Sequence, residues 1–206
     1  MQVKLYTGGH RTALVALGAN LHSGGNPPEI SVPLAMDTLA ARVDGSVLRS
    51  SLYHTPAFPA GAGPQFVNAA MRVEWHGAAA DLLAVLHDVE EEFGRTRSNR
   101  WEARVMDLDL IGLDDAILPD PTTRARWASL TPEQAAQVMP DQLILPHPRL
   151  AERAFVLVPL AEIAADWVDP ATGLSVAAML DALPPAEIAQ IHPVSDATQH
   201  RESGCQ

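Results

Sequence analysis

The chain has 206 residues, of which 47% are hydrophobic and 19% charged, and its formal net charge is −11. These values are typical of one globular domain and not of a disordered chain. The acidic balance argues against binding to a nucleic acid polymer, which needs a basic face. No apolar run approaches the roughly 20 residues of a membrane helix. We therefore expect neither a nucleic acid nor a membrane as a partner.

The termini and the basic residues narrow the class of protein further. The polar residues 1–11 are unlike a signal peptide, and the single cysteine, Cys205, has no partner for an internal disulfide. Both observations favour the reducing cytoplasm. The only lysine, Lys4, is not in a G-x-x-x-x-G-K-[ST] setting, which excludes a Walker-type phosphate loop. Any bound phosphate would have to depend on arginine.

Hydrophobic patterning predicts an alternation of strands and helices. Apolar or alternating runs predict strands at residues 12–17, 46–55, 66–75 and 105–113. Apolar side chains at three- to four-residue spacing predict helices at residues 33–42, 79–93, 153–165 (interrupted at Pro159) and 174–183. The order strand, helix, strand, strand, helix, strand predicts an α+β fold, a ferredoxin-like sandwich in which helices pack on an antiparallel sheet.

The domain organisation follows from the same pattern. We expect a single domain over residues 1–206, acting as a monomer. Residues 119–141 break the pattern with several prolines and a short helical stretch, which is typical of a surface insertion. The tail from about residue 184 is expected to be loose.

Asp107 and Asp109 carry the strongest chemical signal. Side chains two apart on a strand share a face, so both carboxylates project together while Met106, Leu108 and Leu110 point to the core. Two like charges on one face repel unless a cation lies between them, and Mg²⁺ prefers such oxygen ligands. The alternative is a solvated edge strand in a protein that is acidic throughout.

Four arginines directly precede this strand. Arg95, Arg97, Arg100 and Arg104 fall within ten residues that contain one acid, Glu102. Guanidinium groups match phosphate oxygens, and transfer between phosphates needs neutralisation from more than one side. A basic loop that leads into an acidic strand face supplies both. The alternative is that Arg95 and Arg97 pair with the acidic end of the preceding helix.

Several single residues are suited to recognising a flat heterocycle. Trp101 lies in a polar loop, where it has little reason to be core, and Asn68 offers both a donor and an acceptor. Phe66 and Phe155 begin a strand and a helix and are equally compatible with plain core. His147 lies between two prolines, a stiff setting that would hold an imidazole in place, although a lone histidine is more often structural.

These segments, taken in order, resemble the 6-hydroxymethyl-7,8-dihydropterin pyrophosphokinase family of folate biosynthesis. The resemblance runs from about residue 12 to 183 and rests on the blocks ALGANL, SSLYHTPAF, PQFVNAAMRVEW, EEEFGRTRSNRW, DLDLI and LPHPRLAERAFVLVPLAEIA. It implies a ferredoxin-like fold and transfer of the β,γ-pyrophosphate of ATP to the pterin hydroxymethyl group, with release of AMP.

The resemblance also implies roles for individual residues. Asp107 and Asp109 would bind two Mg²⁺ ions that bridge the ATP phosphates, and Arg95 and Arg104 would contact phosphate during catalysis. The ATP-binding group would comprise Glu90, Arg97, Leu110, His147 and Arg153. The pterin-binding group would comprise Thr55, Pro56, Phe66, Asn68, Trp101 and Phe155. A flat ring that forms hydrogen bonds fits aromatic faces and a few fixed polar groups.

The chain departs from the family pattern at three points. Trp101-Glu-Ala-Arg104 stands where the family has Trp-Gly-Pro-Arg, Phe66 stands where tyrosine is common, and the insertion is longer than usual. These departures bear on rate and loop dynamics more than on the reaction.

Three rivals stay open at this point. They are a homologue that binds pterin or nucleotide without catalysis, a different metal-dependent phosphotransferase or phosphatase, and a ferredoxin-like RNA-binding or structural module. Retention of Asp107, Asp109 and the arginines weighs against the first. The Leu-Pro-His-Pro block, together with Phe66 and Asn68, weighs against the second. The charge of −11 weighs against the third.

Overall fold

The computed structural model describes residues 9–57, 63–94 and 105–195. Its elements in chain order are β1 (Arg11–Ala19), α1 (Pro28–Ala40), β2 (Val47–Arg49), β3 (Tyr53–Thr55), β4 (Phe66–Trp75), α2 (Ala79–Glu92), β5 (Asp107–Leu113), α3 (Pro121–Ala128), α4 (Pro132–Gln137), η1 (Leu150–Glu152), α5 (Ala154–Ala164), α6 (Val176–Asp181), α7 (Pro185–Ile188) and β6 (His192–Pro193). Among these residues, none of the helices has the length and apolar character that crossing a bilayer requires.

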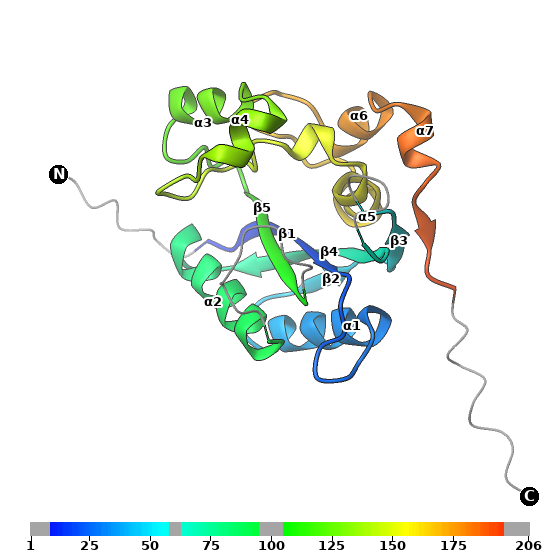
Figure 1. Ribbon diagram of the computed structural model, residues 1–206. Coiled ribbons are helices and arrows are strands. Elements are labelled where there is room, and N and C mark those ends of the chain that lie inside the picture. The colour runs from blue at the N-terminus through cyan, green and yellow to red at the C-terminus, as the bar shows by residue number, and fades with distance from the viewer. Residues whose placement is uncertain (1–8, 58–62, 95–104, 196–206) are drawn as a thin grey trace, which may run out of the picture.

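The strands form one antiparallel sheet in the order β5-β1-β4-β3-β6, and β2 also pairs with β4. Helices α1 and α2 lie against one face of this sheet, and α5 lies against the other (Figure 1). Helix α1 follows β1 and leads to β2, which pairs with β4. Helix α2 follows β4 and leads to β5, the strand at one edge of the sheet. This arrangement confirms the predicted α+β sandwich of helices on an antiparallel sheet.

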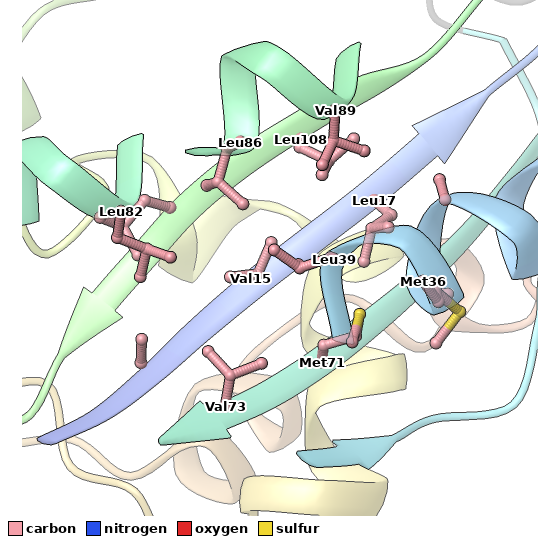
Figure 2. Packing of buried hydrophobic residues seen from close by; sticks show 14 of the residues in the cluster. Val15, Leu17, Met36, Leu39, Met71, Val73, Leu82, Leu86, Val89 and Leu108 are labelled. Atoms are coloured by element: carbon pink, nitrogen blue, oxygen red, sulfur yellow. The ribbon is translucent and has the colours of Figure 1, made fainter. Parts of the chain in front are cut away.

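Strict alternation along β1 divides the interior between the two faces of the sheet. Val15 and Leu17 point toward α1 and α2, where they meet Leu39, Leu86 and others in the larger core (Figure 2). Burying a side chain of this size contributes roughly 1.5–3 kcal/mol, so this layer holds the two helices to the sheet.

The opposite face of the sheet carries a second core under α5 and α6. Leu14 of β1 packs there with Leu157 and Leu160 of α5. The register between β1 and β5 shifts between Leu14 and Val15, which leaves Ile111 as an extra residue in β5. Ile111 faces the second core by ordinary alternation with Leu110, and because the bulge adds one residue, Leu113 faces the first core again.

Two details differ from the sequence-based expectation for the strands and helices. The strand predicted at residues 46–55 is split into β2 and β3: the regular pairing with β4 ends at Arg49 and resumes at Tyr53. Between them the Ser50 amide donates to the Ala70 carbonyl at 3.0 Å, and the Ser50 hydroxyl accepts from the Ala70 amide at 2.8 Å. Helix α5 is not interrupted at Pro159, whose ring is buried within the helix.

The insertion and the tail are more ordered than the sequence predicts. Residues 119–141 contain two helices, α3 and α4, each started by a side chain that caps it: Asp120 accepts from the Thr123 amide and Thr131 from the Gln134 amide. Within the tail expected to be loose from about residue 184, residues 185–193 form α7 and then β6, which pairs with β3 at the sheet edge, while residues 196–206 lie outside the described residues.

Candidate active site

The two aspartates of β5 lie on the α5 face of the sheet, toward the start of the strand. Asp107 pairs across from Gly18 and Asp109 from Ala16, while Leu108 and Leu110 are buried on the other face. The shared face that alternation predicts is therefore confirmed. The side chain of Asp109 is 38% exposed, so a ligand from solvent can reach it.

Arg153 brings a positive charge to this carboxylate pair. Its Nη1 lies 3.3 Å from Oδ2 of Asp109, and its guanidinium carbon lies 5.8 Å from the centre of the Phe155 ring. Both charged side chains are partly exposed, and such pairs contribute about 0–1 kcal/mol to stability. The contact therefore fixes the position of the arginine more than it stabilises the fold.

His147 is held in a defined orientation beside the aspartates. Its backbone amide donates to the Ile111 carbonyl at 2.8 Å, and its Nδ1 accepts from the Arg149 amide at 3.2 Å. Burial lowers the pKa of His147 well below its usual value, the charge of Arg153 lowers it further, and the carboxylate of Asp107 acts in the opposite direction. The lowered pKa favours the neutral ring, and because Nδ1 accepts from the Arg149 amide, the neutral ring has its proton on Nε2 and can donate one hydrogen bond from that atom.

The second half of the candidate site lies two strands away, on β4 and β3. The Nδ2 of Asn68 donates to the Thr55 hydroxyl at 2.7 Å, and both residues are buried. The bond fixes the direction of the amide, so Oδ1 and the second Nδ2 hydrogen are presented in a set orientation. Such a group suits the hydrogen-bonding edge of a heterocycle.

Gly18 is a candidate site residue that the sequence reasoning missed. It pairs with Asn68 on one side and with Asp107 on the other. A Cβ atom at this position would lie 2.6 Å from Oδ1 of Asn68, so only glycine leaves room for the amide. Gly18 is part of the ALGANL block. That the Asn68 amide of β4 lies over it can be seen only once the register of the two strands is known.

Helix α5 braces strand β3, which carries Thr55. Glu162 accepts hydrogen bonds from the Ser51 amide at 2.6 Å and from the Tyr53 hydroxyl. Burial raises the pKa of Tyr53 to about 12, and the nearby Glu162 carboxylate adds to this effect. Tyr53 therefore stays a hydrogen-bond donor at any physiological pH and keeps β3 attached to α5.

Three of the residues predicted to bind pterin lie in different environments. Phe155, in the first turn of α5, is 40% exposed, which does not fit a plain core position. Phe66 is half-buried at the first position of β4, on the same strand face as Asn68. Pro56 is exposed directly after β3. Pterin binding by these three residues stays a prediction, and exposure of Phe155 is compatible with it.

Glu90 and Leu110 lie on the core face of the sheet. Glu90 is 1% exposed, and its Oε1 accepts a hydrogen bond from the Leu108 amide at 2.7 Å. Leu110 is 4% exposed within the larger core. Glu90 therefore supports β5 from behind, between the two aspartates, while the predicted contact of either residue with ATP stays a prediction that this burial does not favour.

Replacing Glu90 by alanine is expected to lower the free energy of unfolding by about 2 kcal/mol, because the buried Leu108 amide loses its acceptor. Urea unfolding monitored by circular dichroism measures this change. Glu90→Gln, which retains an acceptor oxygen, should lose less. Glu91→Ala, at an exposed neighbouring position, should stay within about 0.5 kcal/mol of the parent; equal losses for Glu90→Ala and Glu91→Ala would contradict the support role.

Four of the residues predicted to bind phosphate or pterin fall within residues 95–104. Arg95, Arg97, Trp101 and Arg104 lie outside the described residues. The described chain ends at Gly94 after α2 and resumes at Val105, two residues before Asp107.

The donor set fits Mg²⁺. Within residues 9–57, 63–94 and 105–195, no group of three or more histidine, cysteine or acidic side chains is placed to enclose a metal ion. Two carboxylates on one strand face supply hard oxygen ligands without closing a cage. Mg²⁺ commonly binds through one or two carboxylates and completes its octahedron with water and substrate phosphate oxygens.

Comparison with known proteins agrees with the resemblance read from the sequence blocks. The profile of the 7,8-dihydro-6-hydroxymethylpterin-pyrophosphokinase (HPPK) family matches residues 14–165. The chain is 35% identical to a 2-amino-4-hydroxy-6-hydroxymethyldihydropteridine pyrophosphokinase of Synechocystis over 170 residues, which cover 82% of this chain and 74% of the relative. The Bacillus subtilis protein of the same name is 32% identical over 151 residues, covering 73% of this chain and 77% of the relative.

Solved structures support the fold. The chain superposes on the Plasmodium falciparum HPPK-DHPS A437G protein with a TM-score of 0.60 and 13% identity, covering 86% of this chain and 46% of the other. The wild-type P. falciparum HPPK-DHPS structure gives a TM-score of 0.57 at 13% identity, with 85% and 45% coverage. The chain thus spans about half the length of these solved chains. With the sequence matches, these findings show that the chain belongs to the HPPK family of pyrophosphokinases, which are transferases.

Proposed function

We propose that this chain transfers pyrophosphate from ATP to 6-hydroxymethyl-7,8-dihydropterin, as the names of its relatives indicate. The observation that carries the proposal is one row of residues across the sheet: Asp107, Gly18 and Asn68 are neighbours on β5, β1 and β4. Because adjacent strands lie about 4.8 Å apart, the Cα atoms of Asp107 and Asn68 stand roughly 10 Å apart. That separation suits phosphates at one end and a bicyclic ring at the other.

The reaction requires one bond to form and one to break at the β-phosphorus of ATP. The pterin hydroxymethyl oxygen attacks this phosphorus, the bond to the oxygen bridging the α- and β-phosphates breaks, AMP leaves, and the alcohol proton passes to solvent. Transfer of this kind depends on positioning and charge neutralisation more than on a strong base.

The phosphate end of the site is assigned to Asp107, Asp109, His147 and Arg153. Asp107 and Asp109 would hold Mg²⁺, and we propose two ions; the metal would neutralise negative charge on the β- and γ-phosphates. His147 would donate from Nε2 to a phosphate oxygen, which its fixed tautomer permits. Arg153, already beside Asp109, would place a second positive group there.

The pterin end is assigned to Asn68, Thr55, Pro56, Phe66 and Phe155. The fixed amide of Asn68 would read the ring edge, and the partly exposed phenyl rings would cover its faces. Trp101 would close over the ring and Arg95, Arg97 and Arg104 would contact phosphate, on the basis of the sequence blocks alone. We also propose that the chain acts as a monomer in the cytoplasm, where ATP is supplied; its single cysteine is compatible with that compartment.

Product analysis by nucleotide chromatography tests the reaction directly. With ATP, Mg²⁺ and 6-hydroxymethyl-7,8-dihydropterin, we expect AMP and the pterin diphosphate in equal amounts, and no AMP when pterin or Mg²⁺ is omitted. ADP as the product would indicate an ordinary kinase. Pterin binding without nucleotide turnover would indicate a binding-only homologue.

Replacing Arg104 by alanine is expected to slow pyrophosphate transfer about 100-fold, because one positive group is lost from the charged transition state. The dissociation constant for pterin should change less than threefold. Rapid-quench kinetics measures the first quantity and fluorescence titration the second. Arg49→Ala, at an exposed arginine of β2, serves as the matched control. An unchanged rate in Arg104→Ala would remove this residue from the mechanism.

A further inference from the structure

Helix α3, in the insertion, has one buried side chain, and it is an arginine. Arg124 keeps 9% of its side-chain surface, whereas the other residues of α3 are exposed or half-buried. A buried guanidinium is costly unless charged and polar groups surround it. The partners of Arg124 therefore show what the insertion is attached to.

Arg124 joins two segments that are far apart in the sequence. Its Nη2 donates to Oδ2 of Asp169 at 2.9 Å, and its Nε donates to the Pro146 carbonyl at 3.4 Å. Asp169 follows α5, is 1% exposed and uses its other oxygen to accept from the Ala171 amide at 2.7 Å. The guanidinium thus spans the turn after α5 and the segment that precedes His147.

The Pro146 carbonyl belongs to the residue immediately before His147. The same segment is held elsewhere by backbone bonds: Leu145 exchanges two with Leu118 at 2.8 and 3.1 Å, and the His147 amide donates to the Ile111 carbonyl of β5. Strand β5 therefore holds the turn from one side and Arg124 from another. Both attachments are to the one peptide unit that joins Pro146 to His147, the residue that carries the imidazole.

We propose that Arg124, paired with Asp169, is a positioning residue that holds the His147 turn in the orientation needed to bind ATP. The inference rests on the proposed function, because it takes His147 to be an ATP ligand. It gives the insertion a task in the reaction: α3 carries a guanidinium that reaches the nucleotide half of the site through one carbonyl. Arg124 touches neither substrate.

A purely structural role for the pair predicts a different outcome. Replacing a buried ion pair by apolar side chains is often neutral for stability, so stability and nucleotide affinity can be separated. The double variant Arg124→Met with Asp169→Leu fills the same space but has no donor for the Pro146 carbonyl. If the pair is structural only, this variant should bind ATP like the parent protein.

Calorimetric titration with α,β-methylene-ATP, in the presence of Mg²⁺, measures nucleotide affinity without turnover. We expect the double variant to bind about 10-fold more weakly, with pterin affinity within twofold of the parent. Arg124→Lys, which keeps the charge near Asp169 but lacks the fork that also reaches Pro146, should bind nucleotide about threefold more weakly. Arg126→Met, at an exposed arginine of the same helix, should bind like the parent.

The outcomes separate this inference from the proposed function. Unchanged nucleotide affinity in the folded double variant, or an equal loss of nucleotide and pterin affinity, would overturn the positioning role. If the double variant does not fold, Arg124→Lys decides: parental affinity overturns the proposal and a nucleotide-specific loss supports it. Failure of the parent protein to form AMP overturns the proposed function instead, and is seen before any variant is made.

Discussion

Replacing either Asp107 or Asp109 by alanine is expected to lower the rate of AMP formation by at least about 1,000-fold, equivalent to roughly 4 kcal/mol of transition-state stabilisation. In the proposed site each carboxylate would supply one of two protein oxygen ligands to Mg²⁺, and losing one would weaken the hold on the metal at the triphosphate. Rapid-quench measurement of AMP at saturating ATP and pterin gives the size of the effect.

The fold should tolerate these changes. Neither aspartate is fully buried, and removing one of two like charges on a strand face relieves repulsion. Asp109→Ala also loses the contact with Arg153, which is partly exposed and contributes at most about 1 kcal/mol. Thermal unfolding temperatures should therefore stay close to that of the parent protein, so a lost rate reports lost chemistry.

A matched control and a ligand measurement complete this test. Asp115→Ala removes an exposed aspartate just beyond the end of β5 and should leave the rate unchanged. Mg²⁺ with α,β-methylene-ATP should raise the unfolding temperature of the parent, because a ligand that binds only the folded state stabilises it. This increase should be lost in Asp107→Ala. Mg²⁺-dependent AMP formation by the double variant Asp107→Ala with Asp109→Ala would contradict the metal assignment.

The sequence predicted those parts of the site that depend on local geometry. Alternation along a strand is enough to put Asp107 and Asp109 on one face, because neighbouring side chains point in opposite directions whatever the strand pairs with. The split of β2 from β3 was not predicted, because it involves a hydrogen bond that the Ala70 amide of another strand donates to the Ser50 hydroxyl. Local pattern carries no information about such a contact.

Register across the sheet set the limit of the sequence reasoning. The neighbour relation of Asp107, Gly18 and Asn68 joins three strands separated by about 50 and 90 positions along the chain. Burial of Glu90 behind β5 was missed for the same reason: an acidic side chain on a helix is most often exposed, and only the packing of α2 on β5 shows that it supports the Leu108 amide.

Gly18→Ala is expected to raise the Michaelis constant for pterin about 100-fold. The added Cβ would lie 2.6 Å from Oδ1 of Asn68, closer than two such atoms can approach, so the amide must turn away. Turning costs Asn68 its bond to Thr55 and its alignment with the ring edge. If the turned amide loses two hydrogen bonds to the ring edge, each worth roughly 1.4 kcal/mol, the affinity for pterin falls about 100-fold. Steady-state kinetics with pterin varied at saturating ATP measures the change, and the Michaelis constant for ATP should move little.

A double-mutant cycle shows whether the glycine acts through the amide. If it does, Gly18→Ala should add almost nothing to the loss caused by Asn68→Ala, because the clashing oxygen is already gone. Additive losses would mean that alanine disturbs β1 itself, and the assignment of Asn68 as the ring reader would lose its support. Gly9→Ala, where a Cβ meets nothing within 4 Å, controls for the change of residue. Non-additivity of Gly18 and Asn68 would thus locate pterin recognition at the β1–β4 pair, next to the strand β5 that carries Asp107.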